Sequence, residues 1–217
     1  MELDLHIHTR RYSGCSNIDP MAVLKKAKKV GLDGIALTEH GIRWDDYKIQ
    51  ELIEKSKVYD LLVIPGQEVA CYTRYGEFQG EFLVFGYPTS LGSNKSVEQV
   101  LALVHAECGV VIAAHPFKKL HNGNGDGYYG AGDSIYGLAV DGLEIEHPSY
   151  DEESRSLARD AMHAMHIPGI GCSDSHDLST VGICRTVFER TVNSTESLCE
   201  EIRAGRLEAV SLKNQKI

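Results

Sequence analysis

Residues 2–8 read ELDLHIH, and apolar and polar side chains alternate strictly along this stretch. A period of two is typical of a strand, so one face would carry only aliphatic side chains while Asp4, His6 and His8 share the other. A strand that is merely half exposed needs no histidine, and imidazole is the commonest side-chain metal ligand. The stretch therefore predicts a first strand with a metal site on its polar face, provided that later segments bring further ligands to it.

Strand and helix patterns alternate along the rest of the chain. The first helix pattern starts at Asp19, a capping residue followed by proline, and ends at Gly31. Short continuous apolar runs such as VVIAA, residues 110–114, fit strands that are buried on both faces of a parallel sheet. Alternating strands and helices predict an α/β fold, either an open sheet or a barrel. The helices are expected over residues 19–31, 45–57, 96–108 and 152–165.

The size and composition favour one soluble domain. No linker, repeat or low-complexity tract divides the 217 residues, so a single domain over residues 1–217 is expected. No apolar run approaches the roughly 20 residues that a membrane span needs, and the N-terminus lacks the basic and apolar regions of a signal peptide. The six cysteines include no CxxC pair, and in a chain of this size without an export signal reduced thiols and a cytoplasmic location are expected. The glycine-rich stretch over residues 121–133 is expected to form a mobile loop.

Ligand-type side chains stand at the carboxyl end of most predicted strands. The motif SDSH, residues 173–176, again places an Asp and a His on one face of its strand. In α/β barrels and open parallel sheets, the carboxyl ends of the strands form the active site. Imidazole and carboxylate ligands without paired cysteines suit zinc, manganese or iron(II) rather than a structural zinc cage. The side chains concerned are His6, His8, Glu39, His40, Glu68, His115, Asp174 and His176.

Five segments, in this order, resemble the successive motifs of the PHP (polymerase and histidinol phosphatase) family. They are DLHIHT, LTEHG, PGQEV, AHP and GCSDSH, and together they span residues 4–176. The resemblance implies a distorted, TIM-like (β/α)7 barrel with a cluster of two or three divalent metal ions, of Zn, Mn or Fe. It also implies a metal-dependent phosphoesterase in which a metal-bound hydroxide attacks phosphorus.

The resemblance further implies a role for each ligand. Asp174 and His176 are catalytic candidates as well as ligands, with Asp174 or a water passing a proton to the leaving group. Independently of the resemblance, the position of Asp4 on the polar face of the first strand predicts that it orients a ligand histidine. The implied ligands are His6, His8, Glu68 and Asp174 for the first ion, His40 and His176 for the second, and Glu68 and His115 for the third, with Glu68 bridging.

Two positions depart from the family pattern. Many members carry an Asp or His ligand in the turn after the first strand, where this chain reads SGCS, residues 13–16. Cys15 or a water could take that ligand's place. Members also commonly place a His where Glu81 stands, and Glu81 either binds the third ion or only bounds a strand. His147, at the end of EIEH, is interpreted as structural, with a substrate contact or an alternative ligand as the other interpretations.

Charge indicates the kind of substrate. The chain has 31 acidic and 22 basic residues, a formal net charge of −9. It therefore lacks the general attraction to phosphate backbones on which nucleic-acid-binding proteins depend, and a small phosphorylated substrate is expected rather than a polymer. Cations in the loops after the metal motifs would bind this substrate, since arginine suits bidentate contact with phosphate. The predicted substrate-binding residues are Arg10, Arg43 and Lys118.

Rival functions remain open at this point. A serine hydrolase is not favoured, because the adjacent residues 173–176 cannot all converge and no GxSxG motif exists. A metal-dependent, amidohydrolase-like hydrolase of C–N or C–O bonds uses the same activated water. A regulatory module could keep the metals without catalysis. We predict a phosphoesterase acting on a small phosphate monoester or nucleotide, with these two as alternatives, and the sequence leaves the oligomeric state undetermined.

Overall fold

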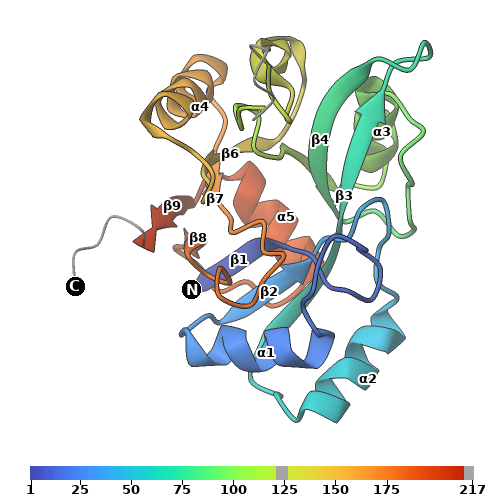
Figure 1. The fold of residues 1–217 in the computed structure, drawn as a ribbon, viewed down its shortest axis with the longest axis vertical. Coiled ribbons are helices and arrows are strands. Elements are labelled where there is room, and N and C mark those ends of the chain that lie inside the picture. The colour runs from blue at the N-terminus through green and yellow to red at the C-terminus, as the bar shows by residue number, and fades with distance from the viewer. Residues whose placement is uncertain (121–126, 213–217) are drawn as a thin grey trace.

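A single curled sheet forms the centre of the protein in the computed structural model, which describes residues 1–120 and 127–212 (Figure 1). The strands are β1 Glu2–Ile7, β2 Gly34–Leu37, β3 Leu62–Tyr72, β4 Phe78–Phe85, β5 Val110–Ala113, β6 Gly142–Glu146, β7 Gly169–Gly171, β8 Cys184–Phe188 and β9 Leu207–Ser211. Within the described residues they form one nine-stranded sheet in the order β7-β6-β5-β4-β3-β2-β1-β8-β9. The sheet is a nearly closed barrel, so the predicted α/β barrel is confirmed, with β8 and β9 added to the first seven strands.

The barrel closes where β1 meets the segment that follows β7. Ile7 and Ser175 form a parallel bridge, with the N–H of His8 donating to the carbonyl of Ser175 at 3.0 Å. The N–H of Ser175 donates in turn to the carbonyl of His6 at 3.2 Å. The two ends of the motif series therefore lie side by side, although they are far apart in the sequence.

Strict alternation of strand and helix is not kept throughout the barrel. β3 pairs antiparallel with β4, and β4 pairs antiparallel with β5. The chain turns directly from β3 into β4, so no helix separates these two strands. Because β3 runs on to Tyr72, the hairpin extends past Glu68, the ligand candidate on that strand.

The alternation predicted for residues 2–8 is also interrupted. The register of β1 against β2 shifts between Asp4 and Ile7, and such a bulge re-aims the side chains that follow it. Leu3 and Leu5 pack in one core with residues of β4 and β5, whereas Ile7 packs in another core. The prediction that all three aliphatic side chains share one face is therefore wrong.

The helices begin and end close to the predicted positions. In α1 the Asp19 carboxylate accepts the N–H groups of Met21 and Ala22, as the capping signal predicts. A capping box of Ser96 and Gln99 starts α3. The helices are α1 Pro20–Lys29, α2 Asp46–Ser56, α3 Val97–Ala106, α4 Glu152–Met165 and α5 Thr195–Arg203, and a short 3₁₀ helix, η1, covers Gly132–Gly137.

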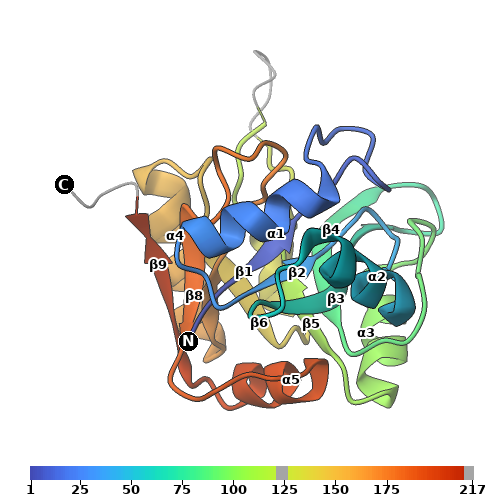
Figure 2. The same cartoon turned by 90° about the horizontal axis from the view of Figure 1, so that it is seen from below.

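Three apolar cores place these helices around the sheet. α1 and α2 pack against β1 and β2, and α3 and α4 pack against β4 to β6. The third core joins the strands' inner residues, such as Leu3 and Ile112, to Leu198 and Ile202 of α5. α5 crosses the end of the barrel at which the N-terminus lies (Figure 2). Since α5 covers that end, the carboxyl ends of the parallel strands at the opposite end remain for the site.

The remaining predictions about the chain have mixed outcomes. Residues 121–126 of the predicted glycine-rich loop lie outside the described residues. The last part of that stretch was expected to lack regular structure, but it enters η1 at Gly132. All six cysteines are free thiols. Among the described helices, none is long and apolar enough to cross a membrane.

Candidate metal centre

All the implied metal ligands converge at the carboxyl ends of the parallel strands. The Nε2 atoms of His6 and His8 are 3.0 Å apart. His6 Nε2 lies 3.2 Å from Glu68 Oε1 and 3.5 Å from Asp174 Oδ1, and His8 Nε2 lies 3.3 Å from Glu68 Oε2 and 3.4 Å from Asp174 Oδ1. Two buried imidazoles and two buried carboxylates thus surround one point. The converging set is His6, His8, His40, Glu68, His115, Asp174 and His176.

Glu68 lies between the two halves of the cluster. His40 Nδ1 is 2.9 Å from Glu68 Oε2, and His115 Nε2 is 3.1 Å from Glu68 Oε1. On the other side, the rings of His40 and His176 stack on His8, with centroids 4.3 and 4.4 Å away. The ligand atoms of His8, His40 and His176 lie within 4.8 Å of one another. Glu68 therefore has the position that a carboxylate bridging two ions requires.

Hydrogen bonds on the outer side of the cluster set the tautomers of two rings. His6 Nδ1–H donates to Glu144 Oε1 at 2.8 Å, and His176 Nδ1–H donates to the carbonyl of Asp174 at 3.0 Å. Each neutral ring then keeps a bare lone pair on Nε2. Buried lone pairs and carboxylates crowded this closely need a shared proton or a cation between them. The imidazole and carboxylate set fits a divalent ion such as zinc, manganese or iron(II).

The charges of the cluster also favour a cation. Burial raises the pKa of Glu68 and Asp174, but the charge of His6 outweighs it, so both pKa values lie well below their usual range. Burial lowers the pKa of His6, yet the charges of Glu68 and Glu144 hold it well above its usual value. The pKa of His8 rises to about 8, because its bonds to Asp174 and Glu68 outweigh burial. Protons on imidazole thus balance the carboxylates, a role that a divalent ion can take over.

Two further groups hold the second oxygen of Asp174. Lys118 Nζ donates to Asp174 Oδ2 at 2.9 Å. The N–H of Ser149 donates to His147 Nδ1 at 3.1 Å, so His147 carries its proton on Nε2 and donates it to the same Oδ2 at 3.3 Å. Asp174 Oδ1 is left facing His6 and His8. His147, interpreted from the sequence as structural, thus contacts the centre and positions a candidate ligand.

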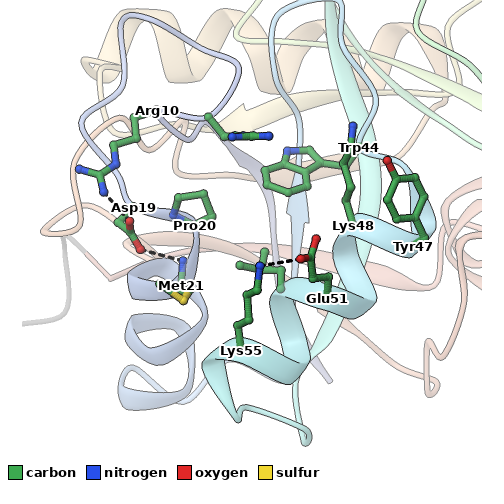
Figure 3. Close-up of a pocket in the computed structure, with 11 residues that line it drawn as sticks. Arg10, Asp19, Pro20, Met21, Trp44, Tyr47, Lys48, Glu51 and Lys55 are labelled. Atoms are coloured by element: carbon green, nitrogen blue, oxygen red, sulfur yellow. Dashed lines mark hydrogen bonds and ion pairs between the residues drawn. The ribbon is translucent and has the colours of Figure 1, made fainter.

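The two predicted substrate-binding arginines lie outside this cluster. Arg10 lies in a groove of about 660 Å³ between α1 and α2, where it pairs with Asp19 at 2.5 Å (Figure 3). Arg43 donates to the carbonyl of Trp44 and to Asp46, both at 2.8 Å. Among the described residues, neither guanidinium contacts a member of the metal cluster. Of the three predicted cations, Lys118 alone touches it, and a role for the arginines stays a prediction.

Both departures from the family pattern lie beside the cluster. Cys15 Sγ is 3.2 Å from His40 Nε2, in the turn where a ligand is missing. Glu81 Oε2 is 3.5 Å from His115 Nε2, and the ligand atoms of Glu81, His40 and Glu68 lie within 4.8 Å of one another. Burial and the charge of Glu68 raise the pKa of Glu81 to about 7. Glu81 therefore has a ligand's position rather than only that of a residue bounding β4.

Sequence reasoning assigned no role to Glu144, which orients the cluster. Its carboxylate is fully buried and accepts both His6 Nδ1–H and, at 2.7 Å, the backbone N–H of His115. The available signal was a pair of glutamates, Glu144 and Glu146, in a short strand whose other residues are glycine, leucine and isoleucine, since buried charges need a partner. The partner of Glu144 stands 138 positions away in the chain, so the pattern alone could not name it.

Glu39 was grouped with the ligand-type side chains, but it contacts other residues. Its carboxylate bonds to Thr9, Ser13 and Trp44, and among the described residues no cluster histidine bonds to it. Asp4 likewise does not orient a ligand ring. It accepts the N–H groups of Ser173 at 3.0 Å and Gly182 at 2.8 Å, and so it fastens the barrel closure.

Comparison with known proteins agrees with this geometry. A family model described as the PHP domain matches residues 4–141, and one described as PHP-associated matches residues 152–207. The chain belongs to the PHP family. Strands from both matched segments lie in one sheet, because β8 pairs with β1. A single domain over residues 1–217 stays a prediction.

Individual relatives extend this comparison. The uncharacterized protein MJ1587 of Methanocaldococcus jannaschii is 30% identical over 155 residues, which cover 67% of this chain and 81% of that protein. A two-domain protein of Bacteroides vulgatus, containing a predicted PHP-like metal-dependent phosphoesterase, shares the fold with a TM-score of 0.72 and 18% identity. The match covers 97% of this chain but only 64% of that one.

A nuclease also shares the fold. The lesion-specific endonuclease EndoQ of Pyrococcus furiosus matches with a TM-score of 0.60 and 18% identity, over 96% of this chain and 57% of its own. At such identities the likeness concerns the fold alone. Substrates therefore have to be inferred from the site of this chain.

Proposed function

We propose that this PHP protein is a metal-dependent phosphoesterase that hydrolyses a small phosphate monoester or nucleotide. The observation that carries the proposal is the convergence of imidazoles and carboxylates on one buried point, with a lysine ammonium beside them. Divalent ions bound here would supply an activated water and neutralise charge on phosphate oxygens. The same cluster without a nearby cation would favour no particular substrate.

The proposed ligands follow the distances within the cluster. His6, His8, Glu68 and Asp174 hold one ion, and their facing atoms are 3.0 to 3.5 Å apart. His40 and His176 hold a second ion next to His8. Glu68 and His115 hold a third, and Glu81 is added to this set because it lies 3.5 Å from His115. The number and identity of the ions belong to the proposal.

Lys118 and Asp174 are the residues proposed to act on substrate. The Lys118 side chain is one quarter exposed, so its ammonium can donate to a phosphate or leaving-group oxygen while it contacts Asp174. Asp174 Oδ2 can take a proton from the attacking water and pass it, directly or through a water, to the leaving oxygen. Lys118 Nζ already touches this Oδ2 at 2.9 Å, which places donor and relay together.

A small substrate is the favoured partner for two reasons. The chain's net charge of −9 gives no general attraction to a nucleic-acid backbone. Within the described residues, the cation beside the cluster is a single lysine, Lys118, rather than a cationic track. A cytoplasmic location, expected from the free cysteines, belongs to the same proposal. The endonuclease fold match makes a DNA substrate one of the outcomes to test.

Phosphate release by the metal-loaded protein tests the proposal. Chelator-stripped protein is resupplied in turn with Mn²⁺, Zn²⁺ and Fe²⁺, and is assayed on phosphomonoesters, nucleotides, a DNA oligonucleotide and amide or ester substrates. We expect metal-dependent phosphate release that Asp174→Asn and His8→Ala abolish without changing the circular dichroism spectrum. Asp177→Asn, at an exposed aspartate three positions beyond Asp174, is the matched control and should keep full activity.

Each other outcome has a distinct meaning. Cleavage of amide or ester substrates alone would replace the phosphoesterase with an amidohydrolase-like enzyme. Metal binding without any turnover would favour a regulatory module. Full activity in either cluster variant would contradict the proposed site.

A further inference from the structure

Glu39 is a fully buried carboxylate whose bonding capacity is filled by donors. Oε1 accepts the Thr9 hydroxyl at 2.6 Å and the Trp44 indole N–H at 2.9 Å. Oε2 accepts the Thr9 backbone N–H at 3.0 Å and the Ser13 hydroxyl at 2.5 Å. Each carboxylate oxygen thus accepts two donors, which fills its two lone pairs. A buried charge with this many donors has a defined position.

The bond to Glu39 fixes the direction of the Ser13 hydroxyl. A hydroxyl has one proton, and Ser13 gives it to Glu39 Oε2. Ser13 Oγ also lies 3.2 Å from His8 Nδ1 and can offer that atom only a lone pair. His8 Nδ1 must therefore carry the ring proton and donate it. In the neutral ring, Nε2 is then left with its lone pair free.

The free nitrogen of His8 points into the proposed ion site. Nε2 lies 3.0 Å from His6 Nε2, 3.3 Å from Glu68 Oε2 and 3.4 Å from Asp174 Oδ1. An ion at this point needs a lone pair on that atom. We infer that Glu39, acting through Ser13, is a positioning residue that sets the His8 tautomer and so prepares His8 Nε2 to bind metal. The inference rests on the proposed metal centre but not on any particular substrate.

His6 on β1 and His8 directly after it are thus oriented in different ways. Glu144 accepts the His6 proton directly, at 2.8 Å, whereas His8 is oriented through a hydroxyl that can point either way. The direction of the hydroxyl depends on the charge of Glu39. In Glu39→Gln, an amide N–H facing Ser13 would donate to Oγ, and the hydroxyl proton would turn toward His8 Nδ1. Nδ1 would become an acceptor, and Nε2 would carry the proton that metal binding must remove.

Trp44 supplies a matched control for this reversal. Its indole donates to Oε1, the oxygen that Ser13 does not use, and its ring lines the groove between α1 and α2 (Figure 3). Trp44→Phe removes one bond to the same carboxylate but leaves the charge of Glu39 and its bond to Ser13. A purely structural role for Glu39 would make the two variants behave alike.

The experiment measures the nitrogen through which His8 binds zinc and the zinc affinity of the protein separately. Protein with ¹⁵N-labelled histidine is loaded with Zn²⁺ alone, and long-range ¹H–¹⁵N spectra identify which nitrogen of His8 binds zinc. A competition titration with a chromophoric chelator gives the zinc affinity, without any substrate. We expect Nε2 ligation in the wild type and in Trp44→Phe, with affinities equal within twofold. Glu39→Gln and Ser13→Ala should bind zinc about 10- to 100-fold more weakly, as for other residues that orient a ligand histidine.

The spectra should change together with the affinities. In Glu39→Gln the His8 signals should show that Nε2 no longer binds zinc in every molecule. Ser13→Thr keeps a hydroxyl and should therefore bind zinc more tightly than Ser13→Ala. Wild-type spectra and affinities in both Glu39→Gln and Ser13→Ala would overturn the inference. So would a wild-type protein that binds no zinc through His8. If Glu39→Gln does not fold, as judged by circular dichroism, Ser13→Ala and Ser13→Thr decide the result.

This test separates the inference from the proposed function. Zinc bound through His8 in a protein that releases no phosphate would reject the phosphoesterase and leave the inference standing. If the protein releases phosphate, and Glu39→Gln and Ser13→Ala both leave the His8 spectrum unaltered, the phosphoesterase stands and the inference is rejected.

Discussion

Replacing Glu81 by glutamine should change how metal binding depends on pH. Burial and the charge of Glu68 raise the pKa of Glu81 to about 7, so near neutral pH about half of the metal-free protein carries a proton there. An ion bound at this carboxylate must displace that proton. Since the pKa of Glu81 is raised to about 7, the free-energy cost of displacing this proton is present below pH 7 and disappears above it. Binding at this site is therefore favoured by high pH.

The size of the effect follows from the pKa. Between pH 8 and pH 6 the fraction of ionised Glu81 falls about tenfold, which corresponds to about 1.4 kcal/mol of binding free energy. The cluster histidines also titrate, so the informative quantity is the ratio of wild-type to Glu81→Gln affinity at each pH. Glutamine keeps the size of the side chain but has no proton to lose. The ratio should be about tenfold larger at pH 8 than at pH 6.

Calorimetric titration with Mn²⁺ and Zn²⁺ at the two pH values measures this ratio. Near pH 7, titrations in two buffers of different ionisation enthalpy should also show about half a proton more released by the wild type than by Glu81→Gln. A ratio that is the same at both pH values within twofold would refute the reasoning, because Glu81 would then not bind an ion.

Three further predictions concern other parts of the protein. Lys118→Met should lower kcat/KM for the phosphoester substrate by about 10- to 150-fold, the loss of one charged hydrogen bond, while Lys118→Arg should retain more activity. Glu144→Gln should weaken zinc binding about 10- to 100-fold in a chelator competition, since it changes the acceptor of His6. Phe85→Ala empties a fully buried position and should lower the free energy of urea unfolding by about 3 to 5 kcal/mol.

Each of these has a result that would count against it. Normal turnover in Lys118→Met would remove the lysine from the substrate site. Unchanged zinc affinity in Glu144→Gln would make the contact with His6 merely structural. A loss below about 1 kcal/mol in Phe85→Ala would mean that the core refills the space.

The sequence pattern was sufficient for an α/β fold, and the family resemblance implied the barrel and the ligands that meet in it. Apolar runs and capping signals predict the strands and helices, and the family motifs imply which strand ends carry His6, Glu68 and Asp174. Parallel strands then bring those ends together for geometric reasons. Local pattern and chain order therefore predict this part of the site.

Other features depend on contacts between distant segments, which local patterns do not contain. The local sequence does not distinguish a Glu144 carboxylate or a Ser13 hydroxyl that faces a histidine ring from one that faces solvent. Arg43 is a different case, because its partner Asp46 stands only three positions further on and the charge pattern alone did not show that the two side chains would pair. The bulge in β1 also separated Ile7 from Leu3 and Leu5, since alternation assumes an uninterrupted ladder.

The barrel closure places the proposed ligands on both sides of a seam. His6 lies on β1 and His8 directly follows it, whereas Asp174 lies on the segment bonded to them. The bond from Ser173 to Asp4 joins residues 169 positions apart. Closing so long a loop has an entropic cost, which grows slowly with the length of the loop. An ion bound by both His8 and Asp174 would hold the end of β1 against the segment that follows β7. The backbone amides of His8 and Ser175, which bond across this seam, would then be the first to exchange with deuterium when a chelator removes the ion.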